Sequence, residues 1–97
     1  MKSKRRLKNY HTLLPFFPDK IIIFRASTRI KTVNKILGID IPYDGAKTLY
    51  EIITKKFEEY EIETGVGACV YFSDCGLRVA KMHDGKISRI EVIRAIH

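Results

Sequence analysis

The stretch LRVAKMHDGKISRIEVI, residues 77–93, decides the fold of this chain. Asp84-Gly85 at its centre is typical of a two-residue type I′ turn, in which both central residues have positive φ. Apolar and polar residues alternate on either side of this turn, as they do in strands with one buried face. The stretch therefore predicts a β-hairpin.

The turn also fixes the register of the hairpin, because His83 then lies opposite Lys86. In this register one face is apolar and the other is mixed. The apolar face, expected to be buried, pairs Val79 with Ile90 and Leu77 with Val92. The second face pairs Arg78 with Glu91 and Met82 with Ile87, and places Arg89 beside Ala80.

Two further strands are predicted ahead of the hairpin. The nearer one is ACVYF, residues 68–72, which a Ser-Asp-Cys-Gly turn joins to the hairpin. The other is the continuous apolar run IIIF, residues 21–24. Such a run is typical of a strand that is buried on both faces, so we expect it inside the sheet rather than at its edge.

Two helices are predicted between these strands. The first follows Ser27 or Thr28, either of which can cap it, and ends at Gly38. Its inward stripe is Ile30, Val33 and Leu37. The second follows either Asp44 or a Thr48–Glu51 capping box. Its inward stripe is Leu49, Ile52, Ile53, Phe57 and Tyr60.

With a short helix over residues 7–14, these elements predict an α+β fold in the order (α)βααβββ. The expected architecture is a mostly antiparallel sheet covered by two helices. A chain of 97 residues is long enough for one core. We assign residues 1–8 to a flexible basic arm and residues 9–97 to a single domain.

The composition excludes several classes of protein. No apolar run approaches the ~20 residues of a membrane span, and the charged N-terminus lacks the apolar segment of a signal peptide. Two cysteines do not make a disulfide framework. We therefore expect a cytoplasmic protein that makes no membrane contact.

Charge is distributed unevenly along the chain. Residues 1–35 carry ten Lys or Arg residues and one acid, whereas residues 36–64 carry three bases and seven acids. A segregated positive field attracts polyanions. The expected nucleic-acid-binding residues are Lys2, Lys4, Arg5, Arg6, Lys8, Arg25, Arg29, Lys31, Lys35, Lys81, Lys86 and Arg89. The acidic stretch 58–63 is either a contact for a basic partner or a solvated helix end.

Catalytic and metal-binding patterns are weaker. His83 and Arg78 are candidates for RNA cleavage, which needs acid–base groups and cations for the developing phosphorane charge. The alternative is a polar hairpin surface. Cys69, Cys75, His83 and His97 lack the spacing of a zinc knuckle, so we expect no metal and no cofactor.

Three interpretations of the function remain open, of which the last is a stable domain within a larger assembly, and the sequence leaves undecided whether the protein is an enzyme. The first is a small RNA-directed protein, a binder or a ribonuclease. Over residues 20–97 the element order, size and basic balance resemble RelE-type ribonuclease toxins of toxin–antitoxin modules in topology. That resemblance implies a nucleic-acid partner, with RNA favoured, and brings no catalytic residues with it. The second is a non-enzymatic inhibitor, immunity or phage-type protein that binds a partner protein through opposed basic and acidic patches. A homodimer is compatible with either class.

Overall fold

The computed structural model describes residues 18–95 of the chain. The basic arm and the short helix expected before residue 18 lie outside these residues. The described elements are the strand β1 (Pro18–Arg25), the helices α2 (Ile30–Leu37) and α3 (Leu49–Glu59), and the strands β2 (Cys69–Tyr71), β3 (Cys75–His83) and β4 (Lys86–Ala95). This element order confirms the predicted α+β fold.

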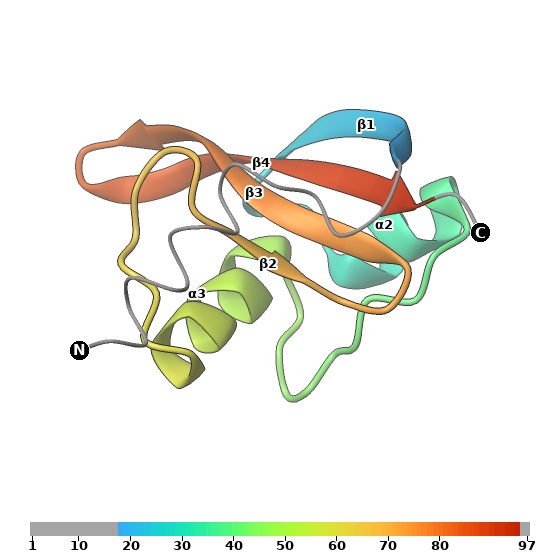
Figure 1. The fold of residues 1–97 in the computed structure, drawn as a ribbon, viewed down its shortest axis with the longest axis horizontal. Coiled ribbons are helices and arrows are strands. Elements are labelled where there is room, and N and C mark those ends of the chain that lie inside the picture. The colour runs from blue at the N-terminus through green and yellow to red at the C-terminus, as the bar shows by residue number, and fades with distance from the viewer. Residues whose placement is uncertain (1–17, 96–97) are drawn as a thin grey trace.

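The four strands form one antiparallel sheet in the order β1-β4-β3-β2. Both helices lie on the same face of this sheet (Figure 1). The core fills the space between helices and sheet. Its largest side chains with almost no exposure are Ile30, Leu37, Ile41, Leu49, Ile52, Ile53, Leu77 and Ile90.

The β3–β4 hairpin has the predicted turn. Asp84 and Gly85 both have positive φ, at 52° and 77°, as a type I′ turn requires. The pairs His83–Lys86, Val79–Ile90, Leu77–Val92 and Arg78–Glu91 all occur in the structure. Val79 and Ile90 are buried on the helix-covered face, so the predicted register and buried face are confirmed.

The tip of the hairpin differs from the prediction. The ladder is irregular on both sides of Lys81, which pairs with Arg89 instead of Ser88. This irregularity rotates the tip, so Met82 and Ile87 still pair but pack against the core. The expectation that they lie on the second face was wrong, because strict two-residue alternation does not hold across a bulge.

The position of β1 also corrects the prediction. The strand lies at the sheet edge, beside β4, and is not buried on both faces. Ile22 and Phe24 pack against the core, whereas Ile21 and Ile23 are 47% and 54% exposed. A run of four apolar residues gives no periodicity from which an edge strand with one covered face can be recognised.

The helix ends combine local and long-range contacts. The predicted capping box of α3 is present: Thr48 Oγ1 accepts from the Glu51 amide at 3.2 Å, and Glu51 Oε1 accepts from the Thr48 amide at 3.2 Å. Tyr60, expected on the inward face, instead follows the last helical residue and is 49% exposed.

The start of α2 was predicted wrongly. Its first flanking residue is Arg29, which makes no side-chain cap, in place of Ser27 or Thr28. The Ile30 amide donates to the Lys47 carbonyl, so a contact with the chain before α3 replaces the cap. The end of α2 at Gly38, with φ of 65°, is confirmed.

Candidate functional site

Three of the predicted cations meet at one end of the sheet. Arg25 on β1 lies opposite Arg89 on β4, and Arg89 lies opposite Lys81 on β3. We call these three residues the basic row. All three are exposed, and they line a surface hollow of about 410 Å³ together with His83 and Ser27.

The other predicted cations in the described region lie apart from this hollow. Arg29 precedes α2, and its backbone forms an isolated antiparallel β-bridge with Thr48. Lys31 and Lys35 are exposed on α2, and Lys86 is exposed beside the hairpin turn. Lys2, Lys4, Arg5, Arg6 and Lys8 lie outside the described residues.

The two catalytic candidates do not come together. His83 is exposed at the end of β3, with its Nε2 3.4 Å from Asp84 Oδ2. Arg78 lies five residues earlier, a separation of roughly 16 Å along a strand. Its guanidinium forms an ion pair with Glu91, as the hairpin register indicated, so it acts as a cross-strand contact.

The cysteines are structural. Cys69 and Cys75 are both buried. Burial raises the pKa of each thiol, and for Cys75 the nearby Asp74 carboxylate adds to the effect. Thiols held protonated are poor nucleophiles and poor metal ligands. Within residues 18–95 no group of three or more His, Cys, Asp or Glu side chains could hold a metal ion.

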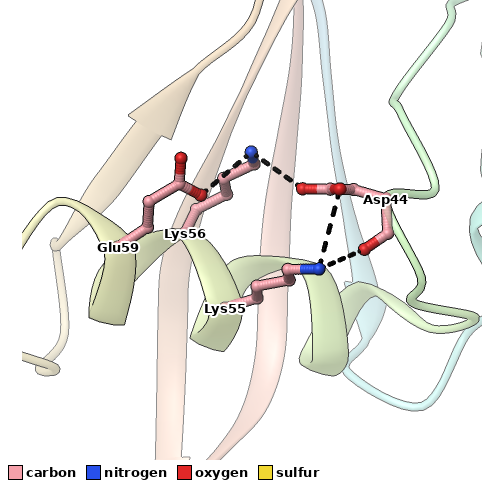
Figure 2. A network of polar contacts seen from close by, with 4 residues as sticks. All are labelled: Asp44, Lys55, Lys56 and Glu59. Atoms are coloured by element: carbon pink, nitrogen blue, oxygen red, sulfur yellow. Dashed lines mark hydrogen bonds and ion pairs between the residues drawn. The ribbon is translucent and has the colours of Figure 1, made fainter.

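Both cations of α3, Lys55 and Lys56, form ion pairs within the protein, which the sequence did not predict. Asp44 accepts from both Lys55 and Lys56, and Lys56 also reaches Glu59 at 3.2 Å (Figure 2). Asp44 has a positive φ of 47° and lies in the link before α3. Hydrogen bonding and charge from Lys56 and Lys55 lower the pKa of the Asp44 carboxyl. Asp44 is 11 and 12 residues away from Lys55 and Lys56 in the sequence, so the pairing is visible only in the folded structure.

A second neutralised group lies at the far end of β1 from the basic row. Arg94 on β4 donates to both carboxylate oxygens of Asp19 on β1 at 2.9 Å, and to the Leu37 carbonyl at the end of α2 at 2.7 Å. We call Asp19, Leu37 and Arg94 the paired end. The Arg94 hydrogen bonds hold the pKa of Asp19 below its ordinary value.

The acidic stretch after α3 forms a second hollow of about 410 Å³. Glu58, Glu61 and Glu63 surround the buried side chains of Phe57 and Ile62. Within residues 18–95, no basic side chain lines this hollow. Both hollows are on the surface of the domain.

The fold and these surfaces define a class: a small α+β domain with a four-stranded antiparallel sheet, two helices and two charged surface hollows. The sequence pattern of the transporter-associated domain family CorC_HlyC matches residues 18–95, all of the described chain. The chain belongs to this family. No curated protein matches its sequence.

Several solved structures share this fold. The region associated with a putative Mg²⁺ and Co²⁺ transporter (CorC) from Neisseria meningitidis MC58 is 17% identical with a TM-score of 0.62, covering 79% of this chain and 91% of that one. A functionally unknown conserved protein from Haemophilus influenzae Rd KW20 is 18% identical with a TM-score of 0.64, covering 78% and 90%. A CorC_HlyC domain of a Xylella fastidiosa Temecula1 hemolysin, in complex with Mg²⁺ and Mn²⁺, is 12% identical with a TM-score of 0.62, covering 84% and 95%.

Membership of this family corrects the predicted function. The RNA-directed and RelE-like interpretations were wrong, as were the nucleic-acid partner and the inhibitor, immunity or phage-type alternative, because the whole described chain matches a transporter-associated domain. The element order misled because small α+β sheets of similar outline serve unrelated functions.

Proposed function

We propose that this domain is a non-catalytic accessory module that adjusts the activity of a divalent-cation transporter. The observation that carries the proposal is the family match over residues 18–95. The N. meningitidis domain of similar fold is described as associated with a putative Mg²⁺ and Co²⁺ transporter, which suggests the class of transported ion.

The charged hollows on the surface of the domain support an accessory role. Neither helix within residues 18–95 has the length and apolar character to cross a bilayer. The described part of the chain also holds no cluster of three side chains suited to a metal ion. The fold offers a four-stranded sheet and two charged hollows as surfaces for regulation.

The test is an in-frame deletion of residues 18–95 in the native host. We expect the deletion to change cellular cobalt and magnesium content, measured by mass spectrometry of washed cells, and to change growth under CoCl₂ challenge. Re-expression of the intact chain should restore both.

A matched point variant tests whether the effect of the deletion comes from losing the folded domain or from altering the messenger RNA. Ile53→Asp places a charge in the core, where Ile53 has no exposure, and should reproduce the deletion because a buried unpaired charge prevents folding. Unchanged cation content and unchanged cobalt tolerance in the deletion strain would refute the proposal.

A further inference from the structure

The basic row brings three like charges close together on neighbouring strands. Arg25, Arg89 and Lys81 are direct cross-strand neighbours on three adjacent strands. Directly opposed side chains in an antiparallel sheet have Cβ atoms about 4.5–5.5 Å apart, and like charges in that position destabilise the sheet. Arg25 and Arg89 form a regular pair, and Lys81 lies opposite Arg89 at the bulge, so the three cations repel one another unless a counter-charge lies among them.

No acid of the three strands supplies this counter-charge. β1, β3 and β4 contain two acidic residues, Asp19 and Glu91. Asp19 is ion-paired with Arg94, and Glu91 with Arg78. Among the ion pairs and hydrogen bonds of residues 18–95, none involves the side chain of Arg25, Lys81 or Arg89. Asp84 in the hairpin turn contacts His83 instead.

The hollow beside the row is shaped by fixed backbone. The Ala26 amide donates to the Ser88 carbonyl at 2.9 Å, which continues the β1–β4 contact past the strand end. Ser88 Oγ donates to the Lys81 carbonyl at 3.2 Å. Ala26 and Ile87, both lining the hollow, are buried. These contacts hold the strands that carry the three cations.

We propose that the basic row binds a phosphate group. Two guanidinium groups and an ammonium offer the several N–H donors that a tetrahedral oxyanion accepts, and Arg forms bidentate hydrogen bonds with phosphate oxygens. The Ser27 hydroxyl lines the same hollow and adds a donor. A multiply charged oxyanion would convert the mutual repulsion of the row into attraction. The site is independent of the proposed transport role, since it rests on the row alone.

Two sources supply this chemistry, a soluble phosphate compound and the headgroup of an anionic phospholipid. The probes are inorganic pyrophosphate, and vesicles of phosphatidylglycerol compared with vesicles of phosphatidylcholine. Binding to pyrophosphate is measured by calorimetry with the full chain at constant ionic strength. Binding to vesicles is measured by co-sedimentation under the same conditions.

The variants are Arg89→Met, which removes the central cation, and Lys35→Met as the control. Lys35 is exposed near the end of α2 and does not line the hollow, so both variants lose one positive charge. We expect Arg89→Met to weaken binding of pyrophosphate, of phosphatidylglycerol vesicles or of both by about tenfold or more, because it removes charge-assisted hydrogen bonds. Lys35→Met should weaken the same binding by less than about twofold, as expected for a distant screened charge.

The outcomes are decisive for the site. Selective loss with pyrophosphate alone identifies a soluble phosphate ligand, and selective loss with phosphatidylglycerol vesicles alone identifies a lipid headgroup. Equal losses in Arg89→Met and Lys35→Met would overturn the proposal, because net charge would then explain the binding. Absence of binding to both probes by the unmodified chain would overturn it as well. Thermal unfolding of both variants checks that each remains folded.

Discussion

Arginine residues are paired with an acid at one end of the β1–β4 ladder and face another arginine at the other end. At the paired end, Arg94 donates to Asp19 and to the Leu37 carbonyl, so one side chain joins both strands to the end of α2. At the basic row, Arg25 and Arg89 face each other with no acid between them. The same residue type therefore stabilises the fold at one end of the ladder and remains available for a ligand at the other.

The comparison shows that charge in a sequence becomes informative only after pairing is known. The basic half of the chain contains Arg25 and Asp19 within one strand, yet only Asp19 has a partner. Lys55 and Lys56 look like exposed helix cations but are neutralised by Asp44 (Figure 2). Arg25, Lys81 and Arg89 remain unpaired on neighbouring strands and form the candidate site.

We expect the largest effect on stability from a substitution that removes the contacts of the paired end. Arg94→Met keeps an unbranched apolar stem but loses the hydrogen bonds to Asp19 and to the end of α2, so we expect the Tm to fall by several degrees. Cys75 lies opposite Arg94 in the ladder and is buried. Its labelling by a maleimide should accelerate in the variant, because the strand ends open more often.

Arg89→Met is the matched control for that experiment, since it removes an arginine from the same strand at the other end. We expect its Tm to be unchanged or higher, and its Cys75 labelling to match the unmodified chain. An equal fall in Tm in both variants would remove the distinction between the two ends.

A smaller effect appears in the pH dependence of stability. The Arg94 hydrogen bonds lower the pKa of Asp19 in the folded state. A depressed carboxyl pKa stabilises the fold above the ordinary Asp pKa of about 4, and this contribution disappears as the pH falls through the folded value. Asp19→Asn should therefore be less stable than the unmodified chain at pH 6, and the difference should shrink below about pH 4. Urea unfolding at pH 6, 4 and 3 measures it; a difference that stays constant with pH would contradict the assignment.

The smallest effect concerns the basic row in the absence of a ligand. Opposed like charges cost roughly 0.2–1 kcal/mol, and salt screens them. Raising NaCl from low to moderate concentration should stabilise the unmodified chain more than Arg89→Met, with a difference of a few tenths of a kcal/mol. Chloride is the only added anion, and urea unfolding gives the free energies. An identical salt response in the two proteins would show that the row carries no repulsion.

The parts of the fold that the sequence predicted are those encoded locally. Asp84-Gly85 and the Thr48–Glu51 box each determine a backbone geometry within a few residues, and both occur as expected. The position of β1 was not predictable, because the IIIF run is equally compatible with a central and an edge strand. The rotation of the hairpin tip arises from packing of Met82 and Ile87, which no alternation rule contains.

The three residues of the basic row were among the expected cations, but the sequence did not group them, and the nucleic-acid role expected of them was wrong. Arg25, Lys81 and Arg89 stood among twelve expected cations, and nothing in the sequence separated them from Lys31 or Lys35. These three residues can be distinguished from the other cations only when the strand order, with β4 between β1 and β3, is known. The family was not predicted: its match extends over residues 18–95, and we had linked no motif of the sequence to it.

The central position of β4 has a consequence for how the domain folds. β4 is the last described strand to be synthesised, yet β1 and β3 both pair with it, and the ladder joins Pro18 to Ala95. On the ribosome, β1 must wait without its neighbour until residues 86–95 have emerged from the exit tunnel. Because pairings this distant along the chain close slowly, we expect the sheet to assemble after translation of the domain is complete, around the two helices and the β2–β3 pairing, which can form earlier.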